Sequence, residues 1–219
     1  VGGRWAWGSG VGHADVVVVG CLVPGEEARG VLSVAVPRAA VRPLDNWTAM
    51  GLCGTGSGEF EVAGCTVPAA HAARLTDPPV QAGPLYRFPV FGLLALAIAA
   101  TASGIARAAL DEFVRLAASK VPQGGQRALA QRATVQEALA RVEAQWRAAR
   151  AFQHEAIAAA WAAAVAGGVP GTALRRDLRL ASTHLAHSAA AVVGRVHTLA
   201  GGDAVFAASP LQRALRDVH

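Results

Sequence analysis

The chain has 219 residues, of which 53% are apolar and 16% are charged, and its formal net charge is +5. This length suits one large or two modest domains, and the alanine-rich apolar share favours closely packed helices over a bulky core. Because the positive residues are scattered along the chain without stacking aromatics between them, composition and charge argue against a nucleic-acid-binding protein.

Short strands and turns dominate the first third of the sequence. The run VVVVGCLV within 15–23 is typical of a fully buried strand, and Pro24-Gly25 closes it. Several short strands at this spacing predict a sandwich or a small barrel. The expected strands are 3–6, 15–23, 30–36, 59–62 and 65–67.

The sequence changes character near residue 80. A linker rich in Pro and Gly is expected over 79–89, between a β-domain at 1–78 and a helical domain at 90–219. Long helices joined by short loops predict an antiparallel bundle, so the expected fold class is α+β. Helices are expected at 91–119, at 128–166, from the N-cap Thr172 to 200, and from Leu211 after the N-cap Ser209 and Pro210.

The sequence favours a cytoplasmic protein without a membrane segment. Residues 90–106 are apolar but contain glycines and polar residues, which is more typical of a buried bundle helix than of a membrane span. No secretory signal pattern is present. The cysteines Cys21, Cys53 and Cys65 are odd in number and form no CxxC pair, which indicates reducing surroundings.

No metal site is expected. His184 and His187 are three residues apart on an expected helix, a spacing that can place two imidazoles on one face. No carboxylate or thiol beside them completes a set of ligands, so the pair alone does not predict a bound metal.

Three segments resemble one family of flavoproteins. Residues 3–14, GRWAWGSGVGHA, resemble the flavin-facing strand and loop of the acyl-CoA dehydrogenase superfamily, and more closely its flavin-dependent two-component monooxygenases. Residues 51–57, GLCGTGS, resemble a second β-domain signature of that branch, and 201–219 resemble the Gly-Gly turn and last helix. The resemblance implies the family's middle β-domain and C-terminal four-helix bundle, with the N-terminal helical domain absent.

The resemblance also implies flavin contacts in the first loop. Trp7 falls where the family places an aromatic against the isoalloxazine, and Ser9 where a hydroxyl approaches flavin N5. Gly8 and Gly10 would let the backbone approach the ring closely. Without the resemblance, the same residues indicate a glycine-rich hairpin with Trp7 in the core.

Gly201 and Gly202 match the turn that approaches the cofactor diphosphate across a subunit interface in FAD-using members. Backbone amides at such a turn suit an anion, whereas a helix C-cap, which also requires Gly, is the alternative. The catalytic base stays unassigned. His219 is the one candidate for the histidine proposed as base in the monooxygenase branch, and the dehydrogenase glutamate lies beyond this segment.

The resemblance implies a flavin-dependent oxidoreductase, with FAD or FMN as cofactor. The leading hypothesis is a monooxygenase or hydroxylase that receives reduced flavin from a separate reductase and oxygenates an aromatic or heteroatom substrate. It is favoured because 120–140 lack the Phe-Gly of acyl-CoA dehydrogenases. An acyl-CoA dehydrogenase and a non-catalytic remnant that only oligomerises are the alternatives. Broad apolar faces on alanine-rich helices predict a homo-oligomer, a dimer or a tetramer.

Overall fold

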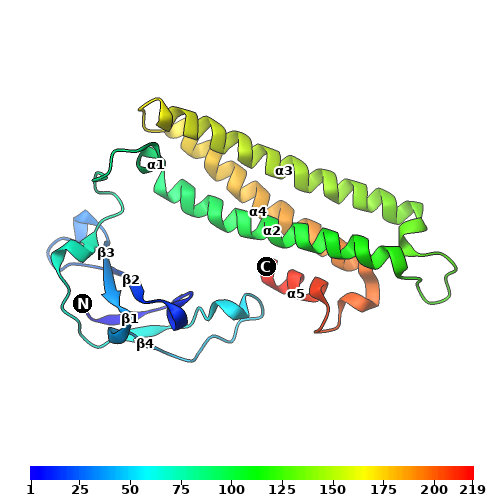
Figure 1. The fold of residues 1–219 in the computed structure, drawn as a ribbon, viewed down its shortest axis with the longest axis horizontal. Helices are drawn as coiled ribbons and strands as arrows, with labels where there is room; N and C mark the ends of the chain where they lie inside the picture. Colours follow the sequence, from blue (N-terminus) through cyan, green and yellow to red (C-terminus); the bar gives the residue numbers. More distant parts are fainter. The chain divides into compact units, whose positions relative to one another are not determined.

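The computed structural model of the protein describes residues 1–219. The chain divides into two compact units, Val1–Pro78 and Pro79–His219. All strands belong to the first unit and all long helices to the second (Figure 1). The α+β class expected from the sequence, small sheets followed by a helical bundle, is confirmed.

The first unit contains two three-stranded antiparallel sheets, ordered β1-β5-β4 and β2-β3-β6. In the second sheet, β2 and β3 form a hairpin in which Val16 faces Pro37 and Cys21 faces Leu32. The strands are β1 Gly3–Trp5, β2 Val16–Cys21, β3 Leu32–Pro37, β4 Arg42–Pro43, β5 Phe60–Val62 and β6 Ala72–Ala73.

One apolar core lies between these sheets. Val19 and Val36 come from the β2-β3-β6 sheet and Phe60 comes from the other, and all three are at most 4% exposed. Side chains from both sheets therefore meet in a sandwich, because successive residues of a strand point to opposite faces.

The expectation that the valine run is buried on both faces is wrong. Within β2, Val17 and Val19 are buried, whereas Val16 and Val18 are 56% and 66% exposed. β-Branched residues favour a strand on either face of a sheet, so an unbroken valine run does not reveal that only one face is covered. The second face of β2 becomes important at the candidate site.

The strand expected at 65–67 is also absent. The chain there is tied instead to the N-terminus, because the amino group of Val1 donates to the Cys65 carbonyl over 2.7 Å and the Cys65 amide donates to the Val1 carbonyl over 2.8 Å. The third strand of the β2-β3-β6 sheet is Ala72–Ala73. Two-residue strands of alanine carry no alternation that a sequence pattern could detect.

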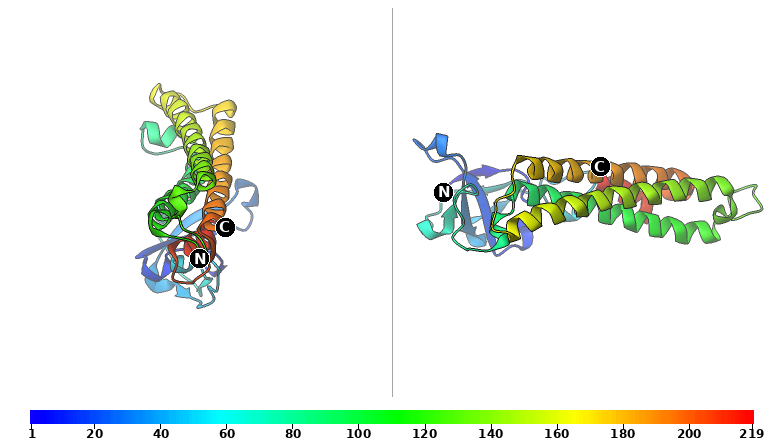
Figure 2. Two further views of the ribbon diagram at one scale, coloured as in Figure 1. Left: turned by 90° about the vertical axis from the view of Figure 1, so that its right-hand side faces the viewer. Right: turned by 90° about the horizontal axis from the view of Figure 1, so that it is seen from above.

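The second unit is a bundle in which α3 runs opposite to α2 and α4, and α5 packs against α2 and α4 (Figures 1 and 2). Its main core contains Leu110, Phe113, Val192 and Val196, all 0% exposed, surrounded by alanines that let the helices approach closely. The helices are α1 Pro84–Arg87, α2 Val90–Ser119, α3 Ala133–Val165, α4 Thr172–Ala200 and α5 Pro210–Val218.

The helix ends differ from expectation in two places. A turn of helix, α1, lies inside the expected linker, and α3 begins at Ala133 after a short 3-10 turn at Leu129–Gln131. Ser209 precedes α5 as its N-cap residue, as expected, whereas Thr172 is the first helical residue of α4 and Gly171 is its N-cap.

Helix α2 is long and apolar enough to cross a membrane by length and composition. Within the bundle, Ala106, Leu110 and Phe113 of this helix are fully buried in the main core.

Candidate functional site

A groove in the first unit brings together the loop after β1 and the uncovered face of β2. Its volume is ≈ 360 Å³. Trp7, Gly8 and Ser9, which the sequence singles out, all line this groove, beside the exposed Val16 and Val18. The lining residues are Trp5 to Ser9, Val11, Ala14, Val16 to Gly20, and Phe60.

The groove carries no charged or imidazole side chain among its lining residues. Its walls are indole, phenyl and valine groups, together with backbone amides and the hydroxyl of Ser9. Such a surface suits a flat, largely apolar ring with a hydrogen-bonding edge. It offers no group that could act as a general acid or base.

Trp7 lies at this groove and not in the core, so the hypothesis of a buried Trp7 is wrong. Its side chain is 75% exposed, and its ring meets Trp47 edge-on with centroids 5.8 Å apart. Its backbone is left-handed, with φ 65°. A left-handed conformation costs a non-glycine residue about 1–2 kcal/mol, and such strain is concentrated at functional sites.

Gly8 allows the loop to lie directly on the core. Its amide donates to the Gly58 carbonyl over 3.0 Å. A Cβ at this position would lie 2.6 Å from Cδ1 of Phe60 and 2.9 Å from a methyl of Val11, so any side chain would displace the loop. Gly10 does not line the groove, but its φ of 76° requires glycine at the next bend.

Ser9 is the first member of a chain of hydroxyl groups. Its Oγ lies 2.7 Å from Oγ of Ser57, which in turn lies 2.7 Å from Oγ1 of Thr55. Thr55 Oγ1 donates to the carbonyl of Leu52 over 2.8 Å. Ser57 is only 7% exposed, whereas Ser9 is exposed at the groove. The backbone follows the same path, since the Gly10 amide donates to the Thr55 carbonyl over 2.9 Å.

The sequence alone indicates no role for Ser57 or Thr55. Both belong to the GLCGTGS segment, which resembles a family signature without indicating what its hydroxyl groups contact. The signal that was present is the alternation of hydroxyl and glycine residues in this segment. Its pairing with Ser9, 48 positions earlier, appears only once β1 and β5 pair.

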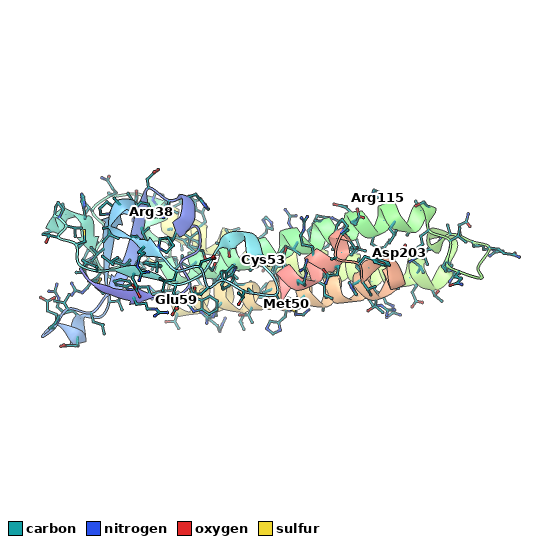
Figure 3. All side chains as sticks on the ribbon, turned by 90° about the horizontal axis from the view of Figure 1, so that it is seen from below. Arg38, Met50, Cys53, Glu59, Arg115 and Asp203 are labelled. Carbon is teal, nitrogen blue, oxygen red and sulfur yellow. The ribbon has the colours of Figure 1, made fainter.

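The far side of the loop is held by Arg38. Its guanidinium donates to the Val11 carbonyl over 2.9 Å and to the Val41 carbonyl over 2.7 Å. Figure 3 shows this arginine within the strand-rich unit. These bonds fix the 3-10 turn Val11–His13 that follows Ser9, so both ends of the loop have defined positions.

An ion pair marks the edge of the β1-β5-β4 sheet and lies outside the groove lining. Arg4 pairs with Glu59, which also accepts from Asn46 Nδ2 over 2.6 Å. The hydrogen bond from Arg4, followed by that from Asn46, lowers the pKa of the Glu59 carboxyl. These groups close the loop leading into β5.

Gly201 and Gly202 lie in the second unit, beside a pocket of ≈ 680 Å³. Gly201, with φ 65°, is the C-cap of α4, so the alternative of a glycine cap is confirmed. Lys120 Nζ donates to the Ala200 carbonyl over 2.6 Å and pairs with Asp203 over 3.0 Å. Asp203 is labelled in Figure 3. Binding of a diphosphate at this turn stays a prediction.

The structure does not bring the histidines together into a metal-binding group. His184 packs near Phe152, with ring centroids 6.4 Å apart, and no group of three or more metal-binding side chains is present. His219 is exposed after the last turn of α5. A role for His219 as a base stays a prediction.

Comparison with known proteins places the chain in a family. Residues 96–219 match a family model described as the C-terminal domain of acyl-CoA dehydrogenase. Over its whole length, the chain is 34% identical in sequence to an indole-3-acetate monooxygenase from Pseudomonas putida, and the match covers 57% of that protein. It is 29% identical to 60% of a flavin-dependent monooxygenase, oxygenase subunit HsaA, from Rhodococcus jostii.

The fold agrees with these matches. The crystal structure of 3-HSA hydroxylase from Rhodococcus sp. RHA1 superposes with a TM-score of 0.89 at 25% identity, over 100% of this chain and 58% of that one. The chain thus spans little more than half the length of the relatives it matches. Because the family model covers more than half of the chain, this protein belongs to the acyl-CoA dehydrogenase family.

Proposed function

We propose that this chain is part of a flavin-dependent monooxygenase and that the flavin ring occupies the groove beside Trp7 and Ser9. The observation that carries the proposal is the groove itself, which is neutral and aromatic-walled, with a hydroxyl and backbone amides. The isoalloxazine is a flat ring with polar edges, so the residues present fit this group. The names of the Pseudomonas and Rhodococcus relatives support the same chemistry.

In this proposal, one oxygen atom of O₂ is added to the substrate and the other leaves as water. Reduced flavin supplies the two electrons that this reaction consumes. The chain's own residues bind and orient the ring. Trp7 covers one edge of the groove, and Ser9 would meet a bound flavin at N5. Gly8 keeps the loop flush with Phe60, so the ring can approach the backbone closely.

The finer parts of the proposal concern partners and cofactor. We propose that a separate reductase supplies the reduced flavin and that the substrate is an aromatic compound, as the name of the Pseudomonas relative suggests. The Gly201–Gly202 turn would hold the diphosphate if the flavin is FAD. Free Cys21, Cys53 and Cys65 support a location in the reducing cytoplasm.

Isotope labelling tests the function. The protein is mixed with chemically reduced flavin and ¹⁸O₂ in the presence of indole-3-acetate and a set of other aromatic acids. We expect one ¹⁸O atom in an aromatic product, which mass spectrometry detects. A parallel anaerobic sample with oxidised FAD receives acyl-CoA thioesters, and we expect the flavin colour to persist. Bleaching by an acyl-CoA without any ¹⁸O-labelled product would contradict the proposal and favour a dehydrogenase.

A further inference from the structure

The hydroxyl chain Ser9–Ser57–Thr55 has a direction, and the direction follows from its inner end. The Leu52 carbonyl can only accept a hydrogen bond, so Thr55, 2.8 Å away, must donate to it. A hydroxyl has a single hydrogen, and that of Thr55 is therefore committed. Thr55 can take part in its 2.7 Å contact with Ser57 only as the acceptor.

The next two hydroxyl groups are constrained in the same way. Ser57 donates to Thr55, so its hydrogen is also committed, and in the 2.7 Å contact with Ser9 it accepts. Ser9 therefore donates inward, to Ser57. What Ser9 Oγ presents to the groove is a lone pair. Chains of hydroxyls aligned in this way polarise each other, which strengthens the acceptor at the outer end.

Reversal of this chain is unfavourable. It would place two oxygen atoms, Thr55 Oγ1 and the Leu52 carbonyl, 2.8 Å apart with no hydrogen between them. The Ser57 hydroxyl would also have to change its partner, and because Ser57 is only 7% exposed it cannot turn to solvent instead. Because a repulsive contact between two oxygen atoms would replace a hydrogen bond, the inward direction is favoured.

We propose that Ser57 and Thr55 are positioning residues that make Ser9 a hydrogen-bond acceptor, and that the groove thereby binds reduced flavin in preference to oxidised flavin. The inference rests on the proposed function, in which Ser9 meets flavin N5. Reduced flavin carries a hydrogen at N5 and can donate to Ser9. Oxidised flavin has a bare lone pair at N5, which would face the lone pair of Ser9.

The preference suits the proposed division of labour. An oxygenase that receives flavin from a separate reductase gains from holding the reduced form and releasing the oxidised form. Thr55 and Ser57 achieve this without touching the ligand, because neither lines the groove. Their role thus differs from that of a residue that contacts flavin.

The test is a pair of substitutions at Thr55, which is partly buried and lies outside the groove lining. Thr55→Val removes the hydroxyl and keeps the side-chain shape, whereas Thr55→Ser keeps the hydroxyl. In the valine variant Ser57 has no inner acceptor and donates to Ser9, which frees the Ser9 hydrogen to point into the groove. The measured quantity is the ratio of dissociation constants for oxidised and reduced FMN, obtained by anaerobic titration of tryptophan fluorescence.

We expect wild type and Thr55→Ser to bind reduced FMN more tightly than oxidised FMN. In Thr55→Val the ratio should fall by about three- to tenfold, the size of one hydrogen bond gained or lost. Ser57→Ala should also lower the ratio, and it replaces Thr55→Val as the test if the valine variant folds poorly. Circular dichroism and thermal melting confirm folding in each case.

The outcomes separate the inference from the function on which it rests. An unchanged ratio in both Thr55→Val and Ser57→Ala would overturn the inference and leave flavin binding intact. An equal fall in Thr55→Ser and Thr55→Val would also overturn it, since packing and not the hydroxyl would then set the preference. If wild type binds neither form of FMN or FAD, the proposed function fails and the inference fails with it.

Discussion

Trp7 combines a left-handed backbone with an exposed ring, and each property affects a different measurement. Its side chain is 75% exposed, so its removal uncovers little core. Its φ of 65° is unfavourable for any residue with a Cβ but neutral for glycine. A position that keeps a strained tryptophan at the edge of a groove indicates that the ring serves binding more than folding.

We therefore expect Trp7→Ala to weaken flavin binding several-fold while changing the free energy of unfolding by less than about 1 kcal/mol. Trp7→Gly should weaken binding equally and be more stable than Trp7→Ala by about 1 kcal/mol, because it relieves the left-handed strain. Urea denaturation and flavin titration measure the two effects. A loss of several kcal/mol in both variants would show that Trp7 supports the core.

At the scale of single residues, the family resemblance points to the groove loop but not to the residues that support it. Trp7, Gly8 and Ser9 are adjacent in the chain, so a local motif is enough to find them. Ser57 and Thr55 join them only through strand pairing, because β1 pairs with β5. A contact between residues 48 positions apart leaves no periodic trace in a single sequence.

At the scale of elements, helices α2 and α3 are joined by one charged cluster. Arg107 bonds to Glu143 over 2.8 Å and stacks over Trp146 at 5.0 Å, and Arg147 reaches the same carboxylate over 2.7 Å. The hydrogen bond from Arg107 outweighs desolvation and lowers the pKa of the Glu143 carboxyl. Cation–π contact with Trp146 fixes the arginine in place.

This cluster predicts a pH dependence of bundle stability. The folded-state pKa of Glu143 is lowered, so its stabilising effect is present above the unfolded pKa of about 4.3 and is lost as the pH falls through the folded value. We expect Glu143→Gln to be less stable than wild type at pH 7 and the difference to shrink towards pH 3. The free energy of unfolding in urea, measured at each pH, checks this. A constant difference across the range would contradict it.

Elements were predictable where local chemistry marks their ends. Ser209 and Pro210 predict the start of α5, and the expected start of α2 is one residue from its actual position at Val90. The exposed face of β2 was not predictable, because four consecutive valines fit either a covered or an uncovered sheet. The sequence therefore does not indicate that one face of β2 forms a wall of the groove.

At the scale of the whole molecule, helix α2 carries an apolar stripe that the bundle does not cover. Phe91, Leu94 and Ile98 follow a spacing that puts them on one face, and they are 62%, 51% and 71% exposed. Exposed apolar stripes of this kind mark sites of association. We propose that this face contributes to the contact between copies of the chain.

We expect wild type to be a dimer or tetramer by light scattering at micromolar concentration, and Ile98→Glu to shift it towards the monomer. Val114→Glu is the control, because Val114 is 49% exposed on another face of the same helix. Both variants should keep their helical content by circular dichroism. A monomeric wild type, or equal dissociation by both substitutions, would count against this face.

The division into a sandwich and a bundle could be anticipated from the sequence, since period-two and helical patterns occupy different stretches of the chain. What one sequence could not supply is the groove, which the loop after β1 and the outer face of β2 form together. The proposed flavin site depends on that groove.

Flavin titration of groove variants tests this account most directly. Val18 lines the groove and is 66% exposed, and Leu22, 69% exposed, follows the same strand outside the groove lining. We expect wild type and Leu22→Lys to bind flavin with equal affinity, and Val18→Lys to bind at least about tenfold more weakly, because a lysine stem fills the groove. Equal affinity in Val18→Lys and Leu22→Lys, or no binding by wild type, would contradict the placement of flavin in this groove.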